Sequence, residues 1–250
     1  MAQKIKVGAV SYLNTKPLIY GFEQGMMKDE VELVIDYPAN IAHKLLNNEI
    51  DIGLVPVAVL PELKEYHVIS DYCIGCDGAV ASVCLFSNVP LHQIETVLLD
   101  YQSKTSAALL KILLKEHWKI TPQLITAEKN FEKNITGCTA GLVIGDRAFA
   151  QRLTSKYSFD LGQAWKEMTG MPFVFAVWAS NKKMYATFAE LFNNATGAGL
   201  QHIDTIVARN RFDNYSMHQY FTKNISYSMD DAKFKALKFF LQKSVHEAVI

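Results

Sequence analysis

Residues 5–18 read IKVGAVSYLNTKPL, and this stretch decides how the chain is organised. A short, mostly apolar segment leads into a polar loop and then into Pro17, which suits the first turn of a helix. Continuous apolar segments separated by helical patterns are typical of parallel strands that helices cover on both faces. The stretch therefore predicts the first strand–helix unit of an α/β protein.

The same alternation continues along the chain. Apolar segments predict strands at Ile5–Val10, Val31–Ile35, Ile52–Val55, Ala81–Phe86, Thr96–Leu99, Gly141–Ile144 and Phe173–Trp178. Helices are predicted over Ala39–Glu49, after Asp100, and from Asp230, where two consecutive acids suit a helix N-terminus. The last helix is expected to turn four apolar side chains inward: Phe234, Leu237, Leu241 and Val245.

Two of these strands are natural crossing points between two lobes. Ala81–Phe86 and Phe173–Trp178 are long and apolar, and each ends in a polar turn. They predict one lobe of residues 1–86 plus 178–250 and a second of residues 87–177, with a ligand cleft between them. Ligands of open α/β sheets bind outside the carboxyl ends of strands, so the loops that follow strands are the candidate functional segments.

The composition excludes several classes of protein. The 250 residues carry 25 Lys+Arg and 25 Asp+Glu, and half are apolar. Zero net charge without a basic run argues against a nucleic-acid partner. No apolar stretch reaches the roughly 18 residues that a membrane span needs. Because the N-terminus resembles a strand rather than a secretory leader, we expect a cytoplasmic globular protein.

The four cysteines are Cys73, Cys76, Cys84 and Cys138. Cys73 and Cys76 have the spacing of a metal or redox pair, but no second ligand pair follows at short spacing. We interpret all four as small buried or half-buried thiols, with a metal site as the weaker alternative. Phosphate-binding and dinucleotide-binding glycine patterns are absent, so no cofactor is expected.

Two loops that follow strands are rich in neutral hydrogen-bond donors. In the first, Thr15 or Asn14 could cap a helix, or Ser11 and Asn14 could donate to a carboxylate. In the second, Ser103 is a candidate N-cap, and Lys104, Thr105 and Ser106 bring further donors. One such helix start on each lobe would suit a small ligand with two carboxylates.

A third loop reads Gly145-Asp146-Arg147. Arg147 could bind an anion in a bidentate manner, although pairing with Asp146 or a surface carboxylate is favoured. None of the seven histidines lies in the three loops, which argues against a Ser-His-Asp nucleophile and a histidine metal site.

The motif at residues 11–18 resembles the chorismate dehydratase family of the futalosine route to menaquinone. The similarity covers most of the chain and continues through Asn48–Val57, Gly78–Val83, Leu99–Asp100 with Ser103 and Thr105–Ser106, Ile144–Asp146, Asp160–Gly162, Trp165 and Thr169–Ala176. It implies a two-lobed type II periplasmic-binding-protein fold used as a cytoplasmic enzyme, a carbon–oxygen lyase. That enzyme would remove water from chorismate to give 3-[(1-carboxyvinyl)oxy]benzoate.

In this hypothesis Asn14 and Ser82 are the catalytic residues that hold the reacting geometry. A desolvated carboxylate of the substrate takes the ring proton, with Asp146 as the alternative base. The remaining residues expected to bind the substrate are Ser11, Tyr12, Ser103, Thr105, Ser106, Gly145 and Asp146.

Two other functions stay open. The sister enzyme 1,4-dihydroxy-6-naphthoate synthase has a Ser-Pro-Cys-Pro-Asn type opening motif and a histidine where this chain has Gly145-Asp146, and neither feature is present. A non-catalytic binding protein for a small carboxylate would share the fold. It would be expected to begin with an export leader or a lipid-anchor cysteine, and this sequence shows neither near its start.

Overall fold

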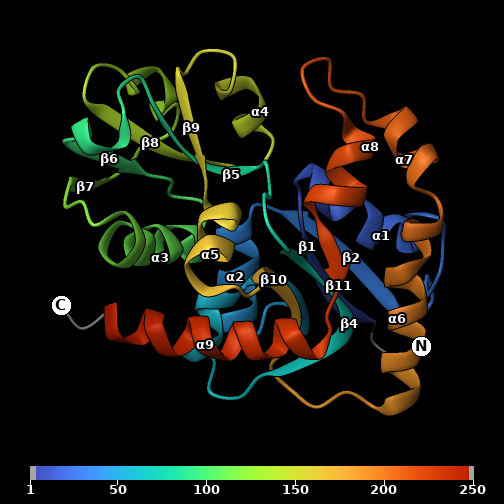
Figure 1. Cartoon of the computed structure of the whole chain (residues 1–250). Coiled ribbons are helices and arrows are strands. Elements are labelled where there is room, and N and C mark those ends of the chain that lie inside the picture. The colour runs from blue at the N-terminus through green and yellow to red at the C-terminus, as the bar shows by residue number, and fades with distance from the viewer. Residues whose placement is uncertain (1–3, 248–250) are drawn as a thin grey trace. The chain divides into compact units, whose positions relative to one another are not determined.

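The structure is a computed structural model that describes residues 4–247, with side chains described up to Ser244. The chain forms two compact units, each with a sheet of its own (Figure 1). Unit 1 contains the residues up to Gly75 together with Val174–Asp231, and unit 2 contains Cys76–Phe173 and the residues from Ala232 onward. No helix within residues 4–247 is long and apolar enough to cross a membrane.

The chain therefore passes between the units at other places than the sequence pattern indicates. It leaves unit 1 at the end of β4 (His67–Cys76), whereas the pattern places the crossing along Ala81–Phe86. That segment instead lies in unit 2, where β5 (Val83–Ser87) is bonded to strands on both sides. A third passage lies at the start of α9 (Asp231–Glu247), which belongs to unit 2 from Ala232 onward.

Unit 1 is built on a six-stranded sheet of order β11-β4-β10-β3-β1-β2. Besides β4, its strands are β1 (Ile5–Val10), β2 (Val31–Asp36), β3 (Ile52–Pro56), β10 (Phe173–Ser180) and β11 (Ser226–Ser228). β1 is parallel to β2 and β3, whereas β10 is antiparallel to β3 and β11 to β4. The carboxyl ends of β1, β2 and β3 thus lie at one edge.

The helices of unit 1 are α1 (Lys16–Glu23), α2 (Pro38–Leu46), α6 (Ala186–Gly197), α7 (Ile203–Arg209) and α8 (Met217–Gln219). Shorter 3-10 turns lie at Leu13–Thr15, Val57–Glu62 and Ala198–Gln201, and a π turn at Tyr220–Asn224. Two glycines allow α1 to pack closely. A Cβ on Gly21 would lie 2.2 Å from the Ala195 carbonyl oxygen, and one on Gly199 would lie 2.1 Å from that of Pro17.

Unit 2 is built on a five-stranded sheet of order β7-β6-β8-β5-β9. Besides β5, its strands are β6 (Thr96–Leu99), β7 (Gln123–Thr126), β8 (Thr139–Ile144) and β9 (Tyr157–Asp160). β6 is parallel to β7 and β8, and β5 is antiparallel to β8 and β9. The helical segments are α3 (Lys104–Ile112), a π turn (Leu113–Trp118), α4 (Arg147–Gln151), α5 (Leu161–Thr169), α9, and 3-10 turns at Leu91–Gln93 and Phe131–Asn134.

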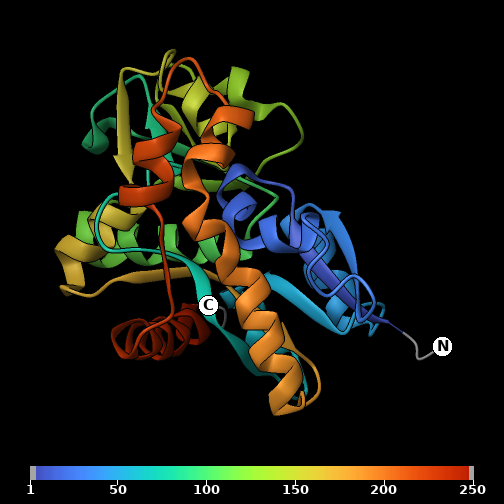
Figure 2. The ribbon, with the colours of Figure 1, turned by 90° about the vertical axis from the view of Figure 1, so that its right-hand side faces the viewer.

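Helix α9 is seen along its length beside α5 in Figure 1 and nearly end-on in Figure 2. Aromatic rings join it to the rest of unit 2, whose first segment ends at Phe173, the first residue of β10. The ring of Phe240 lies 4.9 Å from that of Phe173 and 6.1 Å from that of Trp165, and all three side chains are buried. Such edge-on aromatic contacts stabilise beyond the apolar area that they bury. This cluster is the physical reason that α9 belongs to unit 2.

The inward face of α9 differs in part from the expected one. Leu237 is buried and Leu241 half-buried, as predicted, but Phe234 is 37% exposed. The buried face runs instead through Ala236 and Phe240. The side chain of Val245, which was assigned to the same face, lies outside the described residues.

We expect the Phe240→Ala substitution to lower the free energy of unfolding by about 3–5 kcal/mol, because it leaves a cavity between two buried rings. Urea unfolding followed by circular dichroism measures the change. Lys238→Ala, at an exposed position of the same helix, should stay within about 0.5 kcal/mol of the parent. Equal effects of the two substitutions would contradict the packing of α9 in unit 2.

Candidate functional site

In unit 2 the predicted site residues gather at one edge of the sheet. The parallel strands β6 and β8 end there and the antiparallel β5 begins there, because Val83 pairs with Ile144. The Gly145 N–H donates to the Ser82 carbonyl at 2.8 Å, so the segments before β5 and after β8 are in contact. Gly145 has φ +65°, a conformation that favours glycine.

The helix start after β6 is capped as the sequence predicts. The Ser103 Oγ accepts the Ser106 N–H at 3.2 Å, and the two hydroxyl oxygens lie 3.1 Å apart. Thr105 is fully buried, and Ser103 and Ser106 are nearly so. The Ser103 hydroxyl therefore has a structural role whether or not a ligand binds at this helix start.

Asp100 joins the loops that follow β6 and β8. Its carboxylate has no exposed surface and accepts the N–H groups of Gln102 at 3.0 Å and Ile144 at 3.2 Å. It also pairs with the Arg147 guanidinium at 2.5 Å. Burial raises the pKa of Asp100 above its ordinary value of 3.8, and Arg147 opposes that rise.

Arg147 is a brace between loops. Besides Asp100 it binds the Glu132 carboxylate at 2.7 Å and the Gln102 side-chain oxygen at 2.9 Å. The interpretation of Arg147 as the partner of protein carboxylates, either Asp146 or a surface carboxylate, is confirmed in that Arg147 pairs with Asp100 and Glu132. Asp146 lies half-buried at the start of α4 and makes no side-chain cap there.

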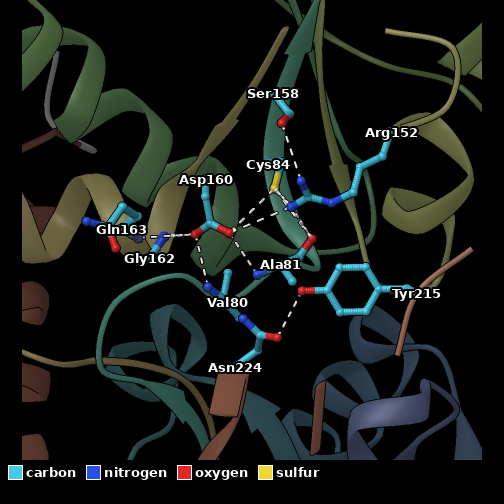
Figure 3. A network of polar contacts seen from close by, with 10 residues as sticks. All are labelled: Val80, Ala81, Cys84, Arg152, Ser158, Asp160, Gly162, Gln163, Tyr215 and Asn224. Atoms are coloured by element: carbon cyan, nitrogen blue, oxygen red, sulfur yellow. Dashed lines mark hydrogen bonds and ion pairs between the residues drawn. The ribbon is translucent and has the colours of Figure 1, made fainter. Parts of the chain in front are cut away.

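Ser82 is the last residue of a tight turn whose first two residues, Val80 and Ala81, are drawn in Figure 3. The Ser82 N–H donates to the Val80 carbonyl at 2.8 Å across Ala81, whose φ is +67°. A three-residue turn with positive φ at its centre is rare and strained for a residue with a Cβ. Ser82 itself is fully buried.

The turn is bound by Asp160, at the end of β9. One carboxylate oxygen accepts the Ala81 N–H at 2.7 Å, and the other accepts the Val80 N–H at 3.0 Å (Figure 3). The latter oxygen also accepts the N–H groups of Gly162 and Gln163 at 3.0 and 3.1 Å, so Asp160 is the N-cap of α5 as well. Sequence reasoning placed Asp160 in a family motif but assigned it no role.

In unit 1 the residues Ser11, Tyr12 and Asn14 follow β1. The Ser11 N–H donates to the Asp36 carbonyl at 3.0 Å, which prolongs the pairing of β1 with β2. Ser11 is exposed, and Tyr12 and Asn14 are half-buried. Tyr12 precedes the 3-10 turn Leu13–Thr15, and its carbonyl accepts the Thr15 N–H at 3.1 Å.

The capping interpretation of this loop is wrong. Thr15 occupies the N-cap position of α1 but makes no side-chain cap, and Asn14 lies one residue before it. The Asn14 side-chain oxygen instead accepts the Thr15 hydroxyl at 3.3 Å. Pro17 stands in the first turn of α1, as expected. The amide of Asn14 is therefore not explained by helix capping.

Tyr227, on β11, reaches the same loop from the far end of the sequence. Its hydroxyl donates to the Asn14 carbonyl at 3.0 Å, and the two residues are 213 positions apart. Burial raises the pKa of Tyr227 well above its ordinary value, so the phenol remains a donor at neutral pH. Sequence reasoning missed Tyr227, because β11 has only three residues and a register shift and leaves no strand pattern.

The cysteines are free thiols. Cys73, Cys76 and Cys84 are buried and Cys138 is half-buried, as expected. Burial raises the pKa values of Cys76 and Cys84 well above the ordinary thiol value. Within the described part of the chain, no group of three or more His, Cys, Asp and Glu side chains could hold a metal ion.

The fold is that of the periplasmic binding proteins. A solved protein from Archaeoglobus fulgidus matches with a TM-score of 0.77 at 15% identity, over 99% of this chain and 98% of that one. A Candida albicans protein described as having the generic periplasmic binding protein fold matches with a TM-score of 0.63 at 14% identity, over 98% and 91%. The aliphatic sulphonate binding protein SsuA of Escherichia coli matches with a TM-score of 0.58 at 14% identity, over 100% and 89%.

The chain belongs to the menaquinone biosynthesis family, whose model matches residues 5–246. A relative from Thermus thermophilus is 29% identical in an alignment 195 residues long, which covers 71% of this chain and 70% of the relative. That relative is named chorismate dehydratase. The resemblance that the motifs indicate is thereby confirmed.

We expect Arg147→Met to lower the free energy of unfolding at neutral pH by roughly 3 kcal/mol, because it leaves the buried Asp100 carboxylate without its cation. The folded-state pKa of Asp100 is already raised and should rise further. A folded state that binds its proton more tightly than the unfolded state loses stability as pH rises above 3.8. The deficit of the variant should therefore shrink as pH falls from about 7 to about 5.

Urea unfolding at both pH values measures this deficit. Lys243→Met is the matched control, because Lys243 pairs with Glu116 in unit 2 while both side chains stay partly exposed. Its effect should be below about 1 kcal/mol. A deficit in Arg147→Met that is constant with pH would exclude Asp100 as its cause.

Proposed function

We propose that the protein is a chorismate dehydratase, a hydro-lyase of menaquinone biosynthesis that acts in the cytoplasm. The proposal is carried by the likeness to the Thermus enzyme across most of the chain, within a family that covers residues 5–246. The proposed product is 3-[(1-carboxyvinyl)oxy]benzoate, formed by loss of one water molecule from chorismate.

The dehydration of chorismate requires that the reacting groups be oriented more than that a strong acid or base be supplied. Chorismate carries two carboxylates and a ring hydroxyl, and loss of water makes the ring aromatic, which favours the product. A protein accelerates such a step by fixing the reacting groups and by placing donors where negative charge develops on the departing oxygen. Neutral amides, hydroxyls and helix N-termini can bind a dianion without bulk positive charge, which suits a chain of zero net charge.

Asn14 is the proposed donor to the reacting part of the substrate. Since its side-chain oxygen accepts the Thr15 hydroxyl, its amide nitrogen is the group that is oriented to donate. The Tyr227 hydroxyl donates to the main-chain carbonyl of Asn14, and this bond fixes the backbone that carries the amide. An amide also adds no charge that would repel the substrate or hold it too tightly before reaction.

Ser82 is the second proposed catalytic residue. The α3 start at Ser103, Thr105 and Ser106 is proposed to bind a carboxylate, together with Ser11, Tyr12 and the Gly145–Asp146 loop. For proton removal we propose a carboxylate of the substrate itself, with Asp146 as the alternative base.

The direct test is to incubate the purified protein with chorismate and to follow the ultraviolet spectrum and the mass of the product. We expect a product that is lighter by one water molecule and keeps the enolpyruvyl group. Chorismate that stays unchanged but raises the melting temperature would instead support a carboxylate-binding protein, because a ligand stabilises the state that it binds.

We expect Asn14→Ser and Asn14→Asp to fold and to lose at least about a hundredfold in kcat, the scale of a lost transition-state donor. Steady-state kinetics with chorismate and a melting curve of each variant provide the measurement. Asn181→Ser is the matched control, because that amide binds the Asn48 side chain in an exposed contact of unit 1. A folded Asn14→Ser variant with near-normal kcat would refute the role of Asn14.

A further inference from the structure

Ala81 has a backbone conformation that its side chain does not favour. It is buried, has φ +67°, and stands at the centre of the turn that the Ser82 N–H closes on the Val80 carbonyl. Glycine adopts this conformation readily, whereas a Cβ makes it unfavourable. A strained backbone persists only where its surroundings over-determine it, so the contacts around Ala81 need a physical account.

The peptide groups on both sides of the Ala81 Cα atom are held by charged side chains. The N–H donates to the Asp160 carboxylate at 2.7 Å, and the carbonyl accepts the Arg152 guanidinium at 2.8 Å (Figure 3). Arg152 in turn lies 3.9 Å from the same Asp160 oxygen. Hydrogen bonds to charged groups are stronger than neutral ones, and fixing both peptide planes fixes the dihedral angles between them.

Helix capping alone does not account for Asp160. The cap of α5 uses the N–H groups of Gly162 and Gln163, whereas the bonds to Val80 and Ala81 reach a segment about 80 positions earlier. The bonds to Val80 and Ala81 fix the backbone that leads directly into Ser82, the next residue along the chain. Ser82 is then held from the other side, where its carbonyl accepts the Gly145 N–H at 2.8 Å.

We propose that Asp160 is a positioning residue for the dehydration, acting through the strained turn at Ala81 to place Ser82, with Arg152 as its support. This inference rests on the proposed function, because Ser82 matters here as a catalytic residue. Without the charge of Asp160, Ala81 relaxes toward negative φ and turns the Ser82 N–H away from Val80.

The test is a double-substitution cycle in the full chain, with chorismate as substrate. Asp160→Asn keeps the shape and removes the charge, and we expect kcat to fall at least about tenfold with little change in KM. Ala81→Gly removes the strain against which Asp160 acts, and it should leave kcat within about threefold of the parent. In the Ala81→Gly background, Asp160→Asn should lower kcat by less than about threefold.

This rescue separates positioning from plain structural support, because lost capping of α5 is not restored by a glycine at position 81. Arg152→Lys, which keeps the charge but loses the planar guanidinium that reaches the Ala81 carbonyl, is made alongside. Arg152→Lys should lower kcat as Asp160→Asn does, and Ala81→Gly should restore it. If Asp160→Asn fails to fold, this variant takes its place in the cycle. Lys166→Met is the control, since it removes only the ion pair of α5 with Asp77.

Additive effects of the two substitutions, or normal kcat in a folded Asp160→Asn variant, would overturn the inference. A parent protein and Lys166→Met variant that both leave chorismate unchanged would overturn the proposed function instead. In that event the melting temperatures of the same four proteins (the parent, the two single variants and the double variant) still show whether Asp160 opposes the strain at Ala81. Independent effects of the two substitutions on melting would reject the coupling itself.

Discussion

The Asp160 carboxylate accepts four main-chain hydrogen bonds, two from the turn at Val80 and Ala81 and two from the start of α5. Because one half-buried carboxylate binds both segments, it joins the strand β9, the helix α5 and the turn before β5. The position of Ser82 and the approach of Gly145 to its carbonyl follow from that assembly. A neutral side chain would bind the same donors more weakly and would offset less of the strain in the turn at Ala81.

A second carboxylate of unit 2, which is fully buried, joins segments in the same manner. Asp100 ties the loop after β6 to the end of β8 through one arginine and two main-chain donors. In unit 1 a neutral group serves instead, since the Tyr227 phenol holds the carbonyl of Asn14. The charged side chains that shape these loops are therefore paired within the protein. The groups proposed to meet the substrate are mostly neutral, which fits a site for a dianion.

The sequence predicted seven strands, including β2 at the edge of its sheet, because each contains a mostly apolar run. It missed β7, β9 and β11, which are short and lie at the edges of their sheets, where solvent replaces apolar neighbours and no run is needed. It also missed β4, whose ten residues mix polar and apolar side chains. Among the interpretations that the structure reversed are two about single side chains: Asn14 does not cap α1, and Phe234 does not face inward.

The sequence by itself determined the α/β class, the loops that follow the strands, the Ser103 cap and the family, because these depend on residues that are neighbours along the chain. Only the tertiary structure decided that Arg147 pairs with Asp100, that Asp160 binds Val80 and Ala81, and that Tyr227 reaches Asn14. These partners are 47, about 80 and 213 positions apart. No local pattern selects a partner at such a separation; the path of the chain brings the groups together, and burial then makes each hydrogen bond obligatory.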